Sequence, residues 1–214
     1  MTSTALLLIR HGETAWNAEH RIQGHLDIPL SATGIRQAAS LGERLAAEAI
    51  TAVYSSELAR AWLTAVPFAA RLGLDINPDS RLRERSFGVF EGLTADEIAA
   101  RHPEGFRLWR MRDPAWAMDD GESGQQLIDR VLSALDDIAS RHRGETVAVV
   151  THGGVLDVVY RNARALAWDA PRDHLMLNAS INRLQAQPEP LRLRIIDWAD
   201  VAHLSDARDE PAQA

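Results

Sequence analysis

Two runs of consecutive apolar residues stand out along the chain, at Leu6–Ile9 and, within the segment Thr146–Val150, at Val147–Val150. Neither alternates between apolar and polar positions, and such continuous runs are typical of strands that are buried on both faces of a sheet. Each run ends abruptly, the first in Arg10-His11-Gly12 and the second in Thr151-His152-Gly153. Ligands of α/β sheets collect at the carboxyl ends of the strands, so the pattern delivers both imidazoles to the place where chemistry usually occurs.

The rest of the pattern alternates between helical and extended segments. Apolar residues spaced three and four apart predict helices, and short β-branched runs predict strands. The alternation indicates an α/β protein, a three-layer α/β/α sandwich with a mostly parallel sheet. We expect helices from the Ser31 cap to about Glu48, from Glu57 to about Leu72 with Gly73 ending it, at Thr94–Arg101, from the Ser123 cap to Arg143 and from about Val155, strands at Ala49–Tyr54 and Asp75–Asn77, a hairpin of Asn178–Gln187 with Leu191–Trp198, and irregular chain over Ala15–Pro29.

A segment of about residues 85–123 breaks this alternation. It is rich in Gly and Pro, and it places Trp109 and Trp116 among Arg107, Arg110 and Arg112. Long connections of this kind often form functional lids over a site, so we interpret the segment as a lid insertion folded over the sheet. The alternative is a solvated loop held in place by its two Trp side chains.

Composition narrows the classes of function. The 214 residues fit one domain, expected over 1–204, with a loose polar tail at 205–214. A net charge of −7 argues against nucleic-acid and anionic-membrane partners. The chain has no Cys and no Lys, which excludes thiol chemistry, P-loop NTPases and Schiff-base enzymes. All 23 basic residues are therefore Arg, which suits bidentate binding of phosphate or carboxylate. The chain shows no basic leader and no long apolar span, so we expect a cytoplasmic protein.

Several sequence blocks resemble the histidine phosphatase superfamily, which includes the cofactor-dependent phosphoglycerate mutases. The resemblance extends from Leu6 to about Leu184 and rests on ordered blocks rather than on one short motif. These blocks are Arg10-His11-Gly12-Glu13-Thr14 with Trp16-Asn17, Gln23-Gly24, Pro29-Leu30, Gly34, Gln37-Ala38, Ser55-Ser56-Glu57-Leu58 with Arg60-Ala61 and Thr64-Ala65, Leu82-Arg83-Glu84, Phe87-Gly88, Glu91-Gly92, and Thr151-His152-Gly153-Gly154.

This resemblance implies a phosphohistidine intermediate on His11 that water then hydrolyses. An imidazole can act as the nucleophile through one nitrogen if a backbone carbonyl orients the other, and nearby guanidinium groups help to keep it neutral. Arg10 and Arg60 would hold the phosphoryl oxygens. His152 would stabilise the charge of the transition state, and the Gly153 amide at a helix entrance would contact the anion.

Glu84 is the expected general acid and, in the second step, the base for water, with Glu91 as the alternative carboxylate. Asn17 and the Gln23-Gly24 turn are expected to complete the phosphate pocket, although they could be ordinary loop residues. No metal is required, because Arg and His supply the positive charge. The other histidines lack ligand spacing and are expected at surface or capping positions, and the Trp residues outside the lid in packing roles; these residues are His20, His25, His102, His142, His174 and His203, and Trp16, Trp62, Trp168 and Trp198.

These observations favour a metal-independent phosphatase without a cofactor that acts on small phosphorylated metabolites. The rival is a phosphoglycerate mutase primed by 2,3-bisphosphoglycerate. The interval from Glu84 to Ser123 is short for a mutase, but the lid arginines could bind a substrate carboxylate. A third class, a catalytically silent binder of phosphorylated ligands, would have a damaged site, whereas all five expected side chains are present. The C-terminal hairpin offers an edge for a homodimer.

Overall fold

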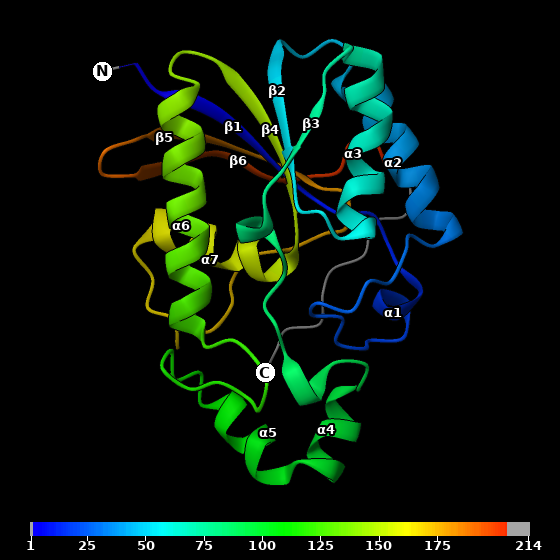
Figure 1. Ribbon diagram of the computed structural model, residues 1–214, viewed down its shortest axis with the longest axis vertical. Helices are drawn as coiled ribbons and strands as arrows, with labels where there is room; N and C mark the ends of the chain where they lie inside the picture. The colour runs from blue at the N-terminus through cyan, green and yellow to red at the C-terminus, as the bar shows by residue number, and fades with distance from the viewer. Residues whose placement is uncertain (1, 205–214) are drawn as a thin grey trace.

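The computed structural model describes residues 2–204, so the expected tail at 205–214 lies outside the described residues. A six-stranded sheet stands between helices α6 and α7 on one face and α2 and α3 on the other (Figure 1). The elements are β1 Thr4–Arg10, α1 Ala15–Ala18, α2 Ala32–Leu45, β2 Ile50–Ser55, α3 Ala59–Leu72, β3 Ile76–Pro78, α4 Ala95–Arg101, α5 Pro103–Arg110, α6 Gly124–Arg141, β4 Thr146–Thr151, α7 Gly153–Arg164, β5 Ile181–Gln187 and β6 Arg192–Asp200, with 3-10 turns at Ser80–Leu82 and Gly88–Phe90.

The two apolar runs form the central pair of the sheet. The strand order is β3-β2-β4-β1-β5-β6, and β1, β4, β2 and β3 are parallel to one another. Arg10 pairs with Thr151 at the last position of the β1–β4 register. The strands β5 and β6 add an antiparallel hairpin beside β1. The predicted three-layer sandwich with a mostly parallel sheet is therefore confirmed.

Burial of β1 on both faces explains its unbroken apolar sequence. Leu6 and Leu8 pack with α6 and α7, whereas Leu7 and Ile9 pack with α2 and α3. Successive strand side chains point to opposite faces, so a strand between two helical layers needs apolar residues at every position. The same reasoning accounts for β4, whose residues from Val147 onward are buried.

Most predicted helix caps are found at the observed helix ends. Ser31 accepts a hydrogen bond from the Gly34 amide at the start of α2, and Ser123 forms a capping box with Gln126 at the start of α6. Gly73 ends α3 in the left-handed region, with φ of +67°. The prediction of irregular chain over Ala15–Pro29 is wrong at its first turn, because Thr14 caps the four-residue helix α1.

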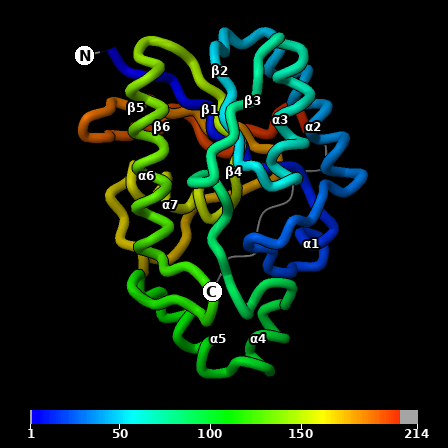
Figure 2. Tube along the Cα trace, viewed as in Figure 1, coloured from blue at the N-terminus to red at the C-terminus, as the bar shows by residue number. Residues whose placement is uncertain are grey.

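The lid, residues 85–123, contains more helix than its Gly and Pro content indicated. The predicted helix is present as α4, but the following helix α5, which begins at Pro103, was missed. Proline is well suited to the first turn of a helix, and here it opens α5. Both helices lie beyond the end of the sheet, apart from the four longer helices (Figures 1 and 2). The lid has an apolar cluster of its own, built on Phe87, Phe90, Ile98 and Met118.

Candidate active site

The β1–β4 pairing brings the two predicted histidines together. His11 follows β1 and His152 caps α7 directly after β4, and their ring centroids lie 5.2 Å apart. The His11 amide donates to the Thr151 carbonyl at 2.9 Å, which extends the ladder to the edge of the site. Two imidazoles at this separation can contact the same tetrahedral oxyanion.

The His11 ring is oriented by its own loop. Its Nδ1 lies 2.7 Å from the Gly12 carbonyl oxygen, which can only accept, so Nδ1 carries the proton and the lone pair is on Nε2. The Gly12 amide donates to Thr64 Oγ1 at 2.9 Å. Position 12 requires glycine, because a Cβ there would lie 2.8 Å from the Gly34 carbonyl oxygen. The loop thus fixes the tautomer of His11 in which Nε2 carries the lone pair.

Two fully buried guanidinium groups flank the histidines. Arg10 is the last residue of β1 and donates to the Met176 carbonyl. Arg60, in the first turn of α3, donates to the Gly24 carbonyl at 2.7 Å and to the Leu26 carbonyl at 2.9 Å. Gly24 adopts a positive φ of +51°, which aims its carbonyl at Arg60. Backbone carbonyls therefore fix the orientation of Arg60.

Both imidazoles are held neutral. Burial lowers the pKa of His11 well below its usual value, and the charges of Arg60 and Arg10 lower it further. Burial and Arg60 act in the same direction on the pKa of His152. Neither ring nitrogen of His152 has a hydrogen-bond partner among residues 2–204. Buried polar groups are normally paired, so an unpaired imidazole beside His11 indicates a ligand position.

The carboxylate of Glu84 lies at the entrance of α7. The Gly154 amide donates to both of its oxygens at 3.1 Å, and the Arg85 amide donates to Oε1 at 2.7 Å. Glu91 has different partners. Its carboxylate accepts from the amides of His25 and Phe87 and so links two loops. The structure thus places Glu84, and not Glu91, against the helix that His152 caps.

The predicted residues of the phosphate pocket include Gly153, Asn17 and Gln23. Gly153 is the first residue of α7, but the amide that Glu84 uses is that of Gly154, which the sequence did not single out. Asn17 caps α1 through the Thr14 amide, and Gln23 is buried. A residue missed entirely is Asn178, whose side chain donates to the His11 carbonyl at 3.1 Å and lies 3.5 Å from Asn17 Oδ1.

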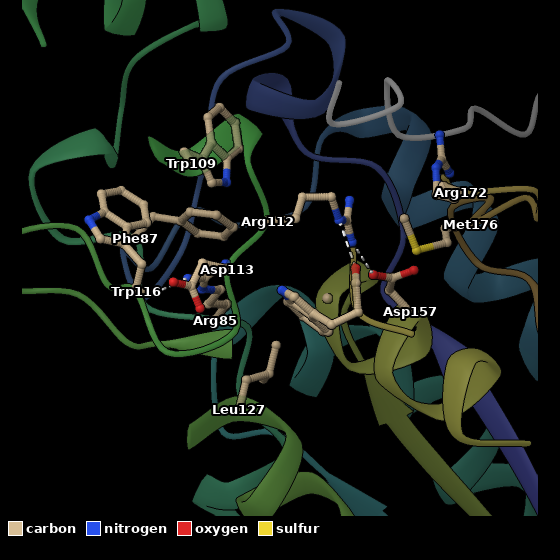
Figure 3. A pocket seen from close by; sticks show the side chains of 12 residues that line it. Arg85, Phe87, Trp109, Arg112, Asp113, Trp116, Leu127, Asp157, Arg172 and Met176 are labelled. Carbon is tan, nitrogen blue, oxygen red and sulfur yellow. Dashed lines mark hydrogen bonds and ion pairs between the residues drawn. The ribbon is translucent and has the colours of Figure 1, made fainter. Parts of the chain in front are cut away.

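A pocket beside Gly154 opens under the lid (Figure 3). Its wall combines aromatic rings with three guanidinium groups from the lid and from the loop before β5. The residues in it include Arg85, Arg112, Arg172, Phe87, Trp109, Trp116 and Trp168. Trp168 packs against the core as expected and also lines this pocket, and the lid interpretation is supported by the contribution of Trp109 and Trp116. Arg107 instead pairs with Glu104 on the exposed side of α5.

The lid is tied to α7 by an ion pair at the pocket. Arg112 donates to Asp157 Oδ2 at 3.1 Å and to the Trp168 carbonyl at 3.0 Å (Figure 3). Arg161 Nε also donates to both carboxylate oxygens of Asp157, each at 2.9 Å. His174 lies 3.2 Å from the same carboxylate and is buried, so the expectation of a surface position for His174 is wrong. The tie fixes the outer wall of the pocket relative to the two histidines.

This fold and this arrangement of Arg, His and Glu define a class of protein. A profile of the histidine phosphatase superfamily (branch 1) matches residues 6–199, and the chain belongs to that superfamily. Within residues 2–204 there is no group of three or more His, Asp or Glu side chains that could hold a metal ion, and no helix long and apolar enough to cross a membrane.

Individual relatives include both phosphatases and mutase-like proteins. The chain is 40% identical over 204 residues to phosphoglycerate mutase-like protein 4 of Arabidopsis thaliana, covering 94% of this chain and 87% of the relative. It is 40% identical over 206 residues to a metal-independent phosphoserine phosphatase of the same plant, covering 94% and 84%. The solved structure of a mycobacterial glucosyl-3-phosphoglycerate phosphatase with VO3 superposes with a TM-score of 0.79 at 33% identity, covering 91% and 98%.

The lowered pKa values predict acid sensitivity. Below about pH 6.5 the unfolded chain binds protons at His11 and His152 that the folded chain does not, so the free energy of unfolding falls as the pH decreases. We expect His152→Asn to weaken this dependence between about pH 7.5 and 5.5, by up to about 1.4 kcal/mol per pH unit. Urea unfolding followed by Trp fluorescence measures it, with the exposed His20→Asn as control. An unchanged slope in His152→Asn would contradict the assignment.

Proposed function

We propose that the protein hydrolyses small phosphate monoesters in two steps, through a phosphohistidine on His11. The observation that carries this proposal is the convergence of two neutral, buried imidazoles, 5.2 Å apart, with two buried guanidinium groups. Phosphoryl transfer needs a nucleophile in line with the leaving oxygen and positive charge around the equatorial oxygens. In this proposal His11 is that nucleophile, and Arg10 and Arg60 supply the positive charge.

In the first step, Nε2 of His11 attacks phosphorus and the bond to the ester oxygen breaks. The departing alkoxide takes the proton of Glu84, so the alcohol leaves neutral and Glu84 becomes a carboxylate. Arg10 and Arg60 hold the phosphoryl oxygens, and His152 donates to one of them. These roles are supported by the carbonyl that orients His11 and by the ring nitrogens of His152 that lack partners.

In the second step, water attacks phosphorus on the phosphohistidine. Glu84 accepts a proton from this water, the P–N bond breaks, and His11 returns to its neutral form with Nδ1 protonated. Inorganic phosphate leaves and Glu84 is again a protonated acid, so the cycle closes without a metal or another cofactor. The Asn17 side chain, the Gln23-Gly24 turn and the Gly153 amide complete the phosphate pocket in this proposal.

The substrate class follows from the pocket beside Glu84. Burial lowers the pKa of Arg85 to about 10, which still leaves the group charged at neutral pH. Arg85 donates to the Glu122 and Trp116 carbonyls, and it forms no ion pair with any carboxylate of residues 2–204. The charges of Glu122 and Glu84 act on Arg85 only from beyond ion-pair distance, and a buried cation that is not paired at contact distance favours an anionic ligand. We therefore propose small monoesters whose alcohol carries a carboxylate.

A mutase on the same scaffold is the second candidate function. It is favoured by the mutase-like relative and by the cations under the lid. A mutase must keep water out and return the phosphoryl group to another oxygen of the same molecule. Interconversion of 2- and 3-phosphoglycerate after priming with 2,3-bisphosphoglycerate, faster than release of phosphate, would favour this reaction over hydrolysis.

The nucleophile is tested by His11→Ala. We expect turnover of p-nitrophenyl phosphate to fall by at least about a thousandfold, because no side chain replaces Nε2. A rapidly quenched reaction with labelled substrate should yield an acid-labile phosphoprotein in the wild type and none in the variant. Circular dichroism checks that the variant folds, and His20→Ala is the matched control. Normal turnover of His11→Ala would refute the assignment, and loss of wild-type turnover in EDTA would refute metal independence.

The acid is tested by Glu84→Gln. Glutamine cannot supply a proton to a departing alkoxide, whereas p-nitrophenolate needs little protonation. We expect kcat for 3-phosphoglycerate to fall by about a hundredfold or more and kcat for p-nitrophenyl phosphate to fall much less. Glu91→Gln, at the carboxylate that ties the loops, is the comparison variant. Equal losses of Glu84→Gln on both substrates would show that Glu84 is not the acid.

The substrate class is tested by Arg85→Gln. Losing the charge partner of a substrate carboxylate costs about 1.5–3 kcal/mol, or roughly ten- to a hundredfold in kcat/KM. We expect this loss for 3-phosphoglycerate but not for glycerol 3-phosphate, which carries a hydroxymethyl group instead. Arg110→Gln, on the exposed side of the lid, controls for a general change of charge. Equal losses on the two esters would contradict a carboxylate contact at Arg85.

A further inference from the structure

The segment that carries Glu84 lies in neither a regular helix nor a strand of the sheet. It follows the turn Ser80–Leu82 on the irregular trace between β3 and α4 (Figure 2). Such a segment has no ladder of backbone hydrogen bonds to fix its position. The Glu84 carboxylate itself accepts from the Gly154 and Arg85 amides, but the backbone of the segment that carries it depends on other contacts.

Those contacts come from Arg130 on α6. Its Nη1 donates to the carbonyls of Arg81 and Arg83 at 2.7 and 2.8 Å, and its Nη2 donates to the carbonyl of Glu84 at 2.8 Å. Its Nε and Nη2 also donate to the two carboxylate oxygens of Glu122 at 2.5 and 2.8 Å. One side chain thus holds three carbonyls of the segment and the far end of the lid.

Two neighbouring side chains complete the support. Thr151 Oγ1 donates to the Leu82 carbonyl at 2.8 Å, and His25 Nε2 lies 2.9 Å from the Glu84 carbonyl. Every carbonyl from Arg81 to Glu84 is consequently held by a side chain. Of these partners only Arg130 reaches more than one carbonyl, so its loss would release the segment most widely.

From these contacts we propose that Arg130, held in turn by Glu122, is a positioning residue for the general acid Glu84. A guanidinium group has five N–H donors, and all five of Arg130 are engaged by the carbonyls and the Glu122 carboxylate. Arg130 therefore has no donor left for a substrate phosphate. This inference rests on the proposed role of Glu84.

Arg130→Lys tests the proposal. Lysine keeps the charge, but one ammonium cannot reach acceptors that a planar fork holds together. We expect kcat for 3-phosphoglycerate to fall by about ten- to a hundredfold, as for a displaced catalytic group, with p-nitrophenyl phosphate little affected. A merely structural role would reduce both activities equally. Arg141→Lys, on the exposed end of the same helix, is the matched control.

Combination with Glu84→Gln separates this inference from the proposed function. If Arg130 acts through Glu84, adding Arg130→Lys to Glu84→Gln causes no further loss on 3-phosphoglycerate. Independent, multiplying losses would overturn the positioning role while leaving Glu84 as the acid. A Glu84→Gln variant without leaving-group dependence would overturn both. If Arg130→Lys does not fold, Glu122→Gln replaces it in each comparison. We then expect a smaller fall in kcat for 3-phosphoglycerate, again with p-nitrophenyl phosphate little affected. An equal loss on both substrates would contradict the proposal.

Discussion

The parallel pairing of β1 with β4 is the constraint on which the site depends. His11 and His152 are more than a hundred positions apart in the chain. They become neighbours because the residues before them, Arg10 and Thr151, are paired at the same level of the sheet. A slip in register would separate the two imidazoles by the length of a residue and turn buried side chains toward the wrong face. Packing against the helices opposes that slip, because Leu6 and Leu8 fit against one helical layer and Leu7 and Ile9 fit against the other. The packing of β1 between the two helical layers thus sets the separation of the two imidazoles.

Burial determines the charge states of the side chains at the carboxyl ends of β1 and β4. Desolvation disfavours charge on the imidazoles, and the fully buried Arg10 and Arg60 add to the effect. The carbonyls of Gly24 and Leu26 orient the Arg60 guanidinium group, and a carbonyl does this without contributing a full negative charge. The Glu84 carboxylate meets two backbone amides. Backbone amides and carbonyls therefore hold Glu84 and Arg60 in place at this edge of the sheet.

The sequence predicted those features that have a local or periodic signal. The buried strands, the Ser31 and Ser123 caps and the stop at Gly73 all follow from one or a few neighbouring residues. The convergence of His11 and His152 followed from parallel pairing, and the superfamily resemblance named the other candidates. Arg130 and Asn178 were missed because their importance lies in bonds to the carbonyls of remote residues, which leave no period or motif. Helix α5 was missed because its Gly and Pro residues suggested a loop.

The lid's separate apolar cluster has a consequence for how this scaffold can diversify. Phe87, Phe90, Ile98 and Met118 pack together without joining the clusters on either face of the sheet. Mutations in that cluster can change the shape of the pocket that Phe87 lines, while the packing on both faces of the sheet still supports His11 and His152. Changes confined to the lid can therefore alter which alcohols fit, while the arrangement at the ends of β1 and β4 is kept.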